Sequence, residues 1–384
     1  MSVKPFFALL FWVAFALLGY THVFYPLLMR WLAQIFSRRF DWPSNIELPA
    51  VTVALCAHNE AAGIMQRLEN LLASRYPKEK IEIIVVSDGS TDATVEKIRA
   101  MNEPRIHLLP QSERSGKSHC LNLALAAARG EIVVFCDTRQ RFAPLTILNL
   151  VTHFSNPQTG AVSGSLEIDS AVSSVGSGMD VYWRIEKFLR HAESRFDSCI
   201  GCTGAVYAIR KKLFQPLPPG TLLDDVVIPM QIAAQGFHVT FEPGAVAYDP
   251  QTLEPEREKI RKRRTLAGNY QMLFRNWRWL LPWKNRLWWM LISHKYLRLA
   301  APLLMLLMFV ANFFLLEQPF YRALFFGQCL FYFMASCGLI FSAKRLRLFS
   351  IPAGFVFLNW MALSGLWHYF RQPSKTAWEK ASHV

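Results

Sequence analysis

The chain has 384 residues, of which 52% are hydrophobic and 14% aromatic, and its formal net charge is +14 at pH 7. This length allows about two to three domains, and the hydrophobic content excludes a wholly soluble enzyme. Lys and Arg gather beside apolar segments instead of forming a stripe interleaved with stacking aromatics, which excludes nucleic acid as a partner and favours contact with membrane lipids.

The first element is an apolar segment from Phe6 to Met29. It exceeds the ~20 residues that a membrane-spanning helix needs, and no small-x-small cleavage site follows it. We therefore expect an uncleaved transmembrane anchor over residues 5–30.

Short β-branched runs alternate with helical patterns from Val51 onward, which is typical of an α/β domain with a parallel, doubly wound sheet. We expect this domain to cover residues 48–253. The expected strands are 51–57, 81–88, 105–109 and 131–137, and the expected helices are 60–73, 93–101, 115–129 and 144–154.

The second half of this domain has a mixed pattern. We expect strands at 160–168 and 204–210, one or two strands within 238–249, and helices at 181–195 and 226–237. Pro229 is expected in the first turn of the last helix, where its missing N–H matters least.

Residues 254–298 carry five tryptophans among Arg and Lys residues. This composition predicts helices that lie in the membrane interface, although a core helix with cation–π contacts is the alternative. Three further spans are expected within 299–370, at 299–316, 323–341 and 351–370, followed by a tail at 371–384.

The basic clusters also predict orientation. Arg38 and Arg39 follow the first span and place the large domain in the cytoplasm. The tail is then expected outside, although it carries Arg371, Lys375 and Lys380.

Acidic residues stand where three expected strands end: Glu60, Asp88 and Asp137. Ligands of open α/β sheets bind at the carboxyl ends of strands, so these side chains predict a site. Taken one by one, each is equally explained as a helix cap.

Two short motifs resemble a P-loop and a zinc site, but neither is complete. Gly116-Lys117-Ser118 resembles the end of a P-loop, but the required earlier glycine is Gln111. Cys199 and Cys202 form a CxxC without a second pair, which favours buried thiols over zinc.

Six motifs occur in order: "ALCAHNEA", "IIVVSDGSTDAT", "GKSHCLNLAL" before "VVFCD", "GCTGAVYAIRK", "LLDDVVIPMQIAAQGFHVTFEP" and "IRKRRTLAGNYQ". This series resembles glycosyltransferase family 2, the inverting GT-A enzymes, especially the membrane-integral branch with the polysaccharide synthases. The resemblance implies a GT-A fold with a doubly wound mixed sheet, between one N-terminal and about three C-terminal transmembrane helices.

The resemblance implies a nucleotide-sugar donor site. Asn59, Glu60 and Asp88 correspond to residues that contact the base and ribose, and Lys117 to a residue near the nucleotide phosphates. Asp137 corresponds to the first Asp of a D-x-D motif that holds Mg²⁺ or Mn²⁺. Arg139 stands at the second Asp, so either the metal has fewer protein ligands or Arg139 adds positive charge beside the phosphates.

The resemblance also implies the catalytic and acceptor residues. Asp225 corresponds to the general base and Asp224 to its orienting neighbour, while caps for the helix that follows are the alternative. Gly201, Thr203 and Gly204 are expected near the acceptor. Trp183 and Glu186 are weaker acceptor candidates, because an amphipathic helix explains their segment equally well. Arg261 and Arg264 align with a Q-x-x-R-W motif that covers the donor diphosphate; Thr265 replaces its Trp.

These features predict an enzyme of the inner (plasma) membrane that transfers sugar from a nucleotide-diphospho-sugar, such as a UDP-sugar, to a growing exopolysaccharide or cell-surface glycan. Transfer of one sugar to a lipid acceptor is the alternative, because the Trp linked to processive synthesis is absent. A non-catalytic scaffold is a third possibility. The export partner is not identified.

Overall fold

The computed structural model describes residues 4–36, 47–168, 177–249, 255–340 and 347–371, and the chain divides into two compact units. The sheet unit contains the described residues of 36–173 and 193–257, and the helical unit those of 1–35, 174–192 and 258–371. Arg38, Arg39 and the predicted tail from residue 372 lie outside the described residues.

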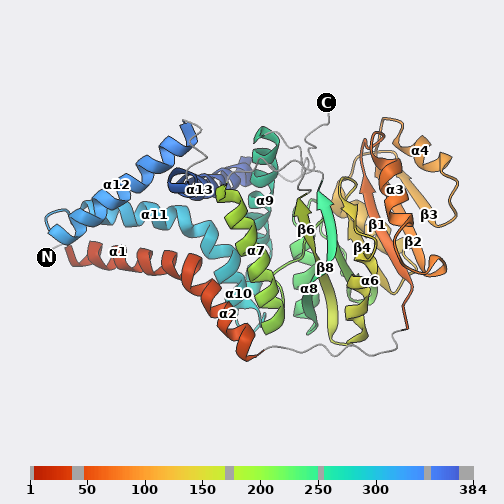
Figure 1. Ribbon diagram of the computed structural model, residues 1–384, viewed down its shortest axis with the longest axis horizontal. Coiled ribbons are helices and arrows are strands. Elements are labelled where there is room, and N and C mark those ends of the chain that lie inside the picture. The colour runs from red at the N-terminus through yellow and green to blue at the C-terminus, as the bar shows by residue number, and fades with distance from the viewer. Residues whose placement is uncertain (1–3, 37–46, 169–176, 250–254, 341–346, 372–384) are drawn as a thin grey trace. The chain divides into compact units, whose positions relative to one another are not determined.

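The sheet unit is built on one eight-stranded sheet in the order β3-β2-β1-β4-β7-β6-β8-β5 (Figure 1). Its strands are β1 (Val51–Ala57), β2 (Ile81–Asp88), β3 (Ile106–Gln111), β4 (Ile132–Cys136), β5 (Arg141–Phe142), β6 (Thr159–Ile168), β7 (Val206–Arg210) and β8 (His238–Asp249). Strands β3, β2, β1 and β4 run parallel, whereas β7 is antiparallel to both β4 and β6. The predicted doubly wound mixed sheet is confirmed.

Helices cover both faces of this sheet, so its central strands are apolar throughout. They are α3 (Ile64–Leu72), α4 (Thr94–Ala100), α5 (Lys117–Ala127), α6 (Thr146–Thr152) and α8 (Asp224–Ala234), with 3₁₀ turns at Lys78–Lys80, His153–Ser155 and Lys211–Leu213. Alternate β1 residues such as Val53 and Leu55 share a core with α3, α4 and α6, while α5 packs against β1 and β2 from the other side. Side chains point to alternate faces of a strand, and continuous burial of β1 follows.

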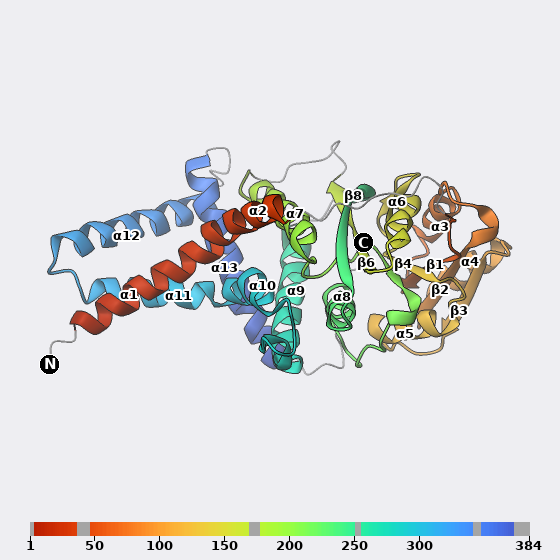
Figure 2. The same cartoon turned by 90° about the horizontal axis from the view of Figure 1, so that it is seen from below.

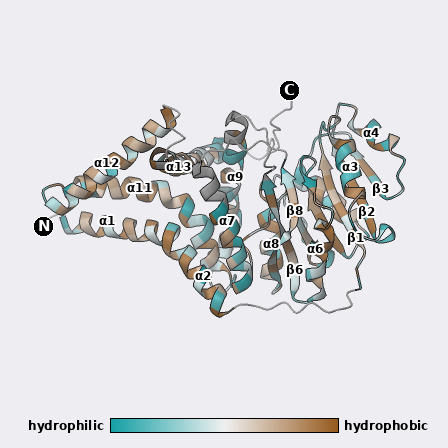
Figure 3. Ribbon diagram, viewed as in Figure 1, coloured by the Kyte–Doolittle hydropathy of each residue, from teal (hydrophilic) through white to brown (hydrophobic). Residues whose placement is uncertain are grey.

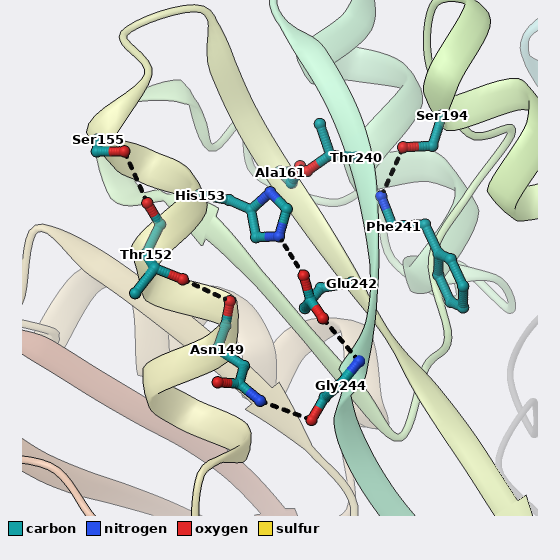
Figure 4. A network of polar contacts seen from close by, with 10 residues as sticks. All are labelled: Asn149, Thr152, His153, Ser155, Ala161, Ser194, Thr240, Phe241, Glu242 and Gly244. Atoms are coloured by element: carbon teal, nitrogen blue, oxygen red, sulfur yellow. Dashed lines mark hydrogen bonds and ion pairs between the residues drawn. The ribbon is translucent and has the colours of Figure 1, made fainter. Parts of the chain in front are cut away.

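Strand β8 contains a bulge that changes the direction of its C-terminal part. Ser163 pairs with Phe241 but Ser165 pairs with Val246, so residues 242–245 oppose a single β6 residue. Helix α6 and the 3₁₀ turn after it hold this bulge (Figure 4): Asn149 Nδ2 donates to the Gly244 carbonyl at 2.8 Å, and His153 Nε2 lies 2.7 Å from Glu242 Oε2. Beyond the bulge, β8 pairs with β5 and ends at Asp249.

The helical unit contains the long apolar helices (Figure 2). Its helices are α1 (Lys4–Gly19), α2 (Tyr25–Ile35), most of α7 (Ser177–Phe196), α9 (Pro255–Arg275), a 3₁₀ turn at Trp277–Leu280, α10 (Trp288–Leu291), α11 (Leu297–Phe313), α12 (Pro319–Ile340) and α13 (Arg347–Arg371). Helix α1 packs along α11, and α12 packs against α13.

Four helices within the described residues are long and apolar enough to cross a membrane: Lys4–Ile35, Trp288–Phe313, Pro319–Ile340 and Leu348–Arg371. Figure 3 shows the hydrophobic colouring that dominates α1, α11 and α12. The four helices agree with the predicted arrangement of one N-terminal and three C-terminal spans.

Two of these spans contain a π-helical turn, at Tyr20–Phe24 and Ile292–Tyr296. The two turns are in contact, since Tyr20 Oη and Ser293 Oγ lie 2.8 Å apart. Such turns often accompany functional sites.

A buried ionic group, the helix cluster, consists of Glu186, His294 and Arg298. Glu186 of α7 accepts from Arg298 Nη1, and its Oε2 lies 3.1 Å from His294 Nε2. Burial alone raises the pKa of Glu186, but Arg298 and His294 outweigh it and hold the pKa well below its usual range. Glu186 is therefore charged and enclosed by basic groups.

Candidate functional site

The ends of β1 and β2 lie side by side, because the strands pair in register up to Ala57 and Ser87. Asn59 follows β1 with left-handed backbone (φ 51°), and its Oδ1 accepts from the Thr91 backbone N–H at 2.8 Å. The Glu60 backbone N–H donates to Thr94 Oγ1 at 2.8 Å. Both predicted donor residues thus lie in the loop after β1, which is hydrogen-bonded to the segment after β2.

Asp88 ends β2 with its side chain fully buried. Its Oδ1 accepts from the Ser115 backbone N–H at 2.7 Å, and both oxygens accept from Gly116 N–H. Gly89 (φ 60°) allows the close approach, since a Cβ there would lie 2.7 Å from the Arg114 backbone nitrogen. Asp88 therefore fixes the loop that leads into α5.

Lys117 is the first residue of α5 and joins two carboxylates. Its Nζ lies 3.1 Å from Asp137 Oδ1 and 3.3 Å from Asp224 Oδ2. We call Lys117, Asp137 and Asp224 the site cluster. Burial opposes the charge of Lys117, but Asp137 and Asp224 outweigh that penalty and raise its pKa above the usual range. Three segments that were predicted separately meet at this ammonium group.

The site cluster lies at the carboxyl ends of β1 and β4. Leu55 of β1 pairs with Cys136, the last residue of β4, and Asp137 follows directly. Strand β1 lies between β2 and β4, so the strand order reverses here. Such a switch point is where open α/β sheets bind ligands.

Tyr207 of β7 contributes to the same site. Its hydroxyl donates to Asp224 Oδ2 at 3.4 Å, and its ring stacks on Phe135 with centroids 4.4 Å apart. Burial, together with Asp224 and Asp225, raises the pKa of Tyr207 well above its usual range. It is therefore neutral and able to donate. A tyrosine inside an apolar strand gave no signal in the sequence.

Asp225 lies against the predicted acceptor loop. Its carbonyl accepts from Cys202 N–H at 2.7 Å, and a Cβ on Gly204 would lie 2.9 Å from Asp225 Oδ2. Gly201 opens the same loop with φ 92°. The structure thus brings Asp225, Gly201 and Gly204 together, with Asp225 less buried than Asp224.

Pro229 explains why the Asp225 carbonyl is available to the loop. Helix α8 begins at Asp224, so Pro229 is in its second turn and the predicted first-turn position is wrong. A helical N–H bonds the carbonyl four residues earlier. Because proline has no N–H, the Asp225 carbonyl is released from the helix and accepts from Cys202 instead.

Thr203 is fixed within the sheet unit and faces away from bulk solvent. Its backbone N–H donates to Ser163 Oγ at 2.9 Å, and its hydroxyl donates to the Gly164 carbonyl at 2.8 Å. These contacts hold the loop of Gly201 to Gly204 against β6. The predicted contact of Thr203 with an acceptor is not tested by them.

Arg139 forms an ion pair with a residue that the sequence did not indicate. Its Nη2 lies 2.6 Å from Oδ2 of Asp249, whose side chain is 4% exposed. The two residues are 110 positions apart and meet because β8 runs beside β5 after its bulge. The guanidinium charge is therefore balanced inside the protein.

Three predicted residues belong to the helical unit. Arg261 and Arg264 are partly buried in α9, and Thr265 Oγ1 donates to the Arg261 carbonyl at 3.1 Å. Trp183 is in α7, and its side chain lies outside the described residues. Their roles at the donor or acceptor stay predictions.

The residues present fit a divalent metal only in part. The Asp137 side chain is 42% exposed, and a carboxylate oxygen suits Mg²⁺ or Mn²⁺. Within the described residues, however, no group of three or more His, Cys, Asp or Glu side chains is arranged to hold a metal. Asp137 would have to share the ion with the donor phosphates.

Comparison with known proteins agrees with this geometry. Residues 52–217 match the family described as Glycosyl transferase family 2. A probable glycosyltransferase, YdaM, of Bacillus subtilis (strain 168) is 26% identical over 252 residues, which are 61% of this chain and 59% of YdaM. The poly-β-1,6-N-acetyl-D-glucosamine synthase of Staphylococcus aureus (strain COL) is 25% identical over 254 residues, 60% of this chain and 61% of the synthase. The chain thus spans about three fifths of these relatives.

A solved structure resembles nearly the whole chain. It is the mannosyltransferase PcManGT from Pyrobaculum calidifontis in complex with GDP-Man and Mn²⁺, with a TM-score of 0.69 and 26% identity. The match covers 94% of this chain and 99% of that one. Since it extends beyond residues 52–217, the likeness includes described helices outside the family match.

Proposed function

We propose, for a chain whose residues 52–217 form a family 2 glycosyl transferase domain, that the protein is a membrane-embedded inverting glycosyltransferase. It transfers a sugar from a nucleotide-diphospho-sugar to a cell-surface glycan. The observation that carries this proposal is the site cluster at the sheet's switch point, with Asp225 against the adjacent glycine loop.

Each group has a chemical task in this reaction. The acceptor hydroxyl oxygen forms a bond to the anomeric carbon while the bond from that carbon to the phosphate oxygen breaks. The electron pair leaves with the nucleoside diphosphate, and the hydroxyl proton passes to the Asp225 carboxylate. Asp224, held by Lys117 and Tyr207, fixes the start of α8 and with it Asp225.

The donor is bound mainly through its base and phosphates. Asn59 and Glu60 offer acceptor oxygens to base and ribose, while Lys117 supplies positive charge near the diphosphate. Asp137 would hold a divalent metal, which would neutralise charge on the leaving diphosphate. Arg139 is paired with Asp249, so its proposed part is to position the loop after β4.

The proposed location is the plasma membrane, with the sheet unit on the cytoplasmic side. The four apolar helices support a multi-pass protein, and the side chains of Trp277 and Trp283, 54% and 74% exposed, suit the headgroup region. The orientation is tested by introducing glycosylation sites into loops of the chain. Modification outside the cell of a site in the sheet unit overturns the proposed orientation.

A second candidate concerns the donor and the product. The near-complete match to a mannosyltransferase with bound GDP-Man supports GDP-mannose, whereas the similarity to the S. aureus synthase supports a donor of N-acetylglucosamine. Thr265 in place of the Trp of processive synthases supports transfer of a single sugar, for example to a lipid acceptor.

The test uses the full-length chain in detergent or nanodiscs with a panel of UDP-sugars and GDP-mannose, with Mg²⁺, with Mn²⁺ and with chelator. We expect release of one nucleoside diphosphate, abolished in Asp225→Asn. Product length then distinguishes a polymer from a single addition. No release above the Asp225→Asn background with any donor and any acceptor extract overturns the proposed function.

A further inference from the structure

Asp137 is the one member of the site cluster that faces solvent substantially. Its side chain is 42% exposed, against 22% for Lys117 and 7% for Asp224. The same carboxylate that suits a metal is thus already in contact with an ammonium group, 3.1 Å away. A cation that reaches Asp137 from solvent therefore competes with Lys117 for this carboxylate.

The second basic residue of this region does not compete for Asp137 in the same way. Arg139, two positions later, donates to Asp249 at 2.6 Å, and Gln140 Nε2 lies 3.4 Å from the same oxygen. Asp249 is nearly inaccessible, so this pair is a fixed part of the β5–β8 edge. Lys117 is left as the cation that balances the exposed Asp137.

Lys117 contacts two carboxylates, Asp224 and Asp137, that differ in their burial. Asp224 is buried at the start of α8 and also accepts from Tyr207, which keeps it in place. The loop before Lys117 is held by both oxygens of Asp88. The backbone at Lys117 is therefore fixed. Its long flexible side chain contacts Asp137, and ions from solvent can replace this contact.

We propose that Lys117 is an exchangeable internal counter-ion that competes with the divalent metal for Asp137. Without donor, the ammonium group neutralises Asp137. When a metal and a nucleoside diphosphate bind together, the metal takes Asp137 and the ammonium, still anchored on Asp224, turns to the phosphates. This inference rests on the proposed function and adds that Lys117 opposes metal binding alone while it supports metal binding with donor.

The expected size follows from the charges. A monovalent and a divalent cation about 4–5 Å apart at a half-exposed site repel by more than 1.4 kcal/mol even at high effective dielectric, which is a factor of ten. Removal of the ammonium group should therefore tighten Mn²⁺ binding by roughly tenfold or more.

The experiment measures Mn²⁺ binding to the full-length chain in detergent by electron paramagnetic resonance of free Mn²⁺, with no turnover. Lys117→Met is compared with wild type and with Lys212→Met, which removes an exposed lysine of the Lys211–Leu213 turn. We expect a roughly tenfold lower Kd for Mn²⁺ in Lys117→Met only. Binding of GDP and UDP in the presence of Mn²⁺ should weaken in the same variant.

Lys117→Arg and Lys117→Gln complete the series. Arginine keeps the charge and should keep Mn²⁺ binding weak, while glutamine is a second neutral variant if methionine destabilises the fold. Unchanged or weaker Mn²⁺ binding in a folded neutral variant overturns the counter-ion role, as does tighter binding in Lys117→Arg. Because the readout needs no glycosyl transfer, tighter Mn²⁺ binding with no transfer to any acceptor would refute the proposed function alone.

Discussion

The site cluster and the helix cluster have opposite charge balance. In the site cluster, one ammonium group serves two carboxylates, and Asp225 adds a further acid nearby. In the helix cluster, Arg298 and His294 surround the single carboxylate of Glu186. Excess acid around one cation leaves capacity for another cation, such as a metal. A carboxylate enclosed by bases has no such capacity, and it serves to hold helices together.

Asp225→Asn tests the chemical side of this contrast and should have the largest effect. The amide cannot take the acceptor proton, so turnover should fall by about 10²- to 10⁴-fold, with unchanged thermal unfolding. The measurement is nucleoside diphosphate release at saturating donor. Retained turnover would show that the base is another residue.

Glu186→Gln tests the structural side. The change removes the carboxylate that Arg298 and His294 contact and should lower the stability of the helical unit by about 3 kcal/mol. The matched control is Glu317→Gln in the same unit, whose pair with Lys4 is exposed and should not matter. Thermal unfolding in detergent measures both. If Glu186→Gln and wild type unfold at the same temperature, the helix cluster does not contribute to stability.

The pH dependence of the Glu186 contribution has a defined sign. Its pKa is depressed in the folded protein, so the stabilisation is complete above the unfolded value and is lost as pH falls through the folded value. The stability difference between wild type and Glu186→Gln should stay constant from pH 7 to about pH 5 and shrink only under more acid conditions. A difference that disappears between pH 7 and 6 would contradict the depressed pKa of Glu186.

Pro229→Ala should have a smaller effect on acceptor use. The new N–H can bond the Asp225 carbonyl within α8 and so compete with Cys202. Loss of one such hydrogen bond predicts an increase in acceptor KM of about fivefold, with donor KM unchanged. Pro157→Ala, at an exposed turn, is the control. An unchanged acceptor KM would separate the loop from acceptor binding.

Tyr207→Phe should have the smallest effect. The hydrogen bond to Asp224 is long, at 3.4 Å, and the stack on Phe135 is kept. We expect a two- to threefold lower turnover, in keeping with a weak bond, measured beside Phe135→Leu, which perturbs the stack alone. A larger loss than in Asp225→Asn would give Tyr207 a direct part in the chemistry.

Much of the sheet was predictable because its signals are local. The apolar runs predicted β1 and β2 with the bounds that the structure has, whereas 238–249 was expected to form one or two strands and is the single strand β8. Strand-end acids predicted that Asp88 and Asp137 lie at one edge. Contacts that depend on distant segments were not predictable. The Arg139–Asp249 pair depends on the β8 bulge, and no periodic pattern in the sequence predicts how many residues this bulge contains.

Side-chain partners were also beyond sequence reasoning. Lys117 was predicted near the phosphates, but its two carboxylate partners come from β4 and α8, whose relative position only the folded sheet fixes. The release of the Asp225 carbonyl by Pro229 depends on where α8 begins. A shift of one or two residues in that start changes which hydrogen bond is lost, so the local pattern was insufficient.

The π-helical turns at Tyr20–Phe24 and Ile292–Tyr296 decide how the two spans respond to a single-residue deletion. A π turn holds about one residue more than an α turn. Shortening either π turn by one residue would let it relax to regular α-helix with little rotation of the helix beyond it, whereas one deletion in an adjoining α turn would rotate everything beyond it by about 100°. In the second span that rotation would carry Arg298 off the face that meets Glu186, so the π turn tolerates a change of length that the α turns beside it do not.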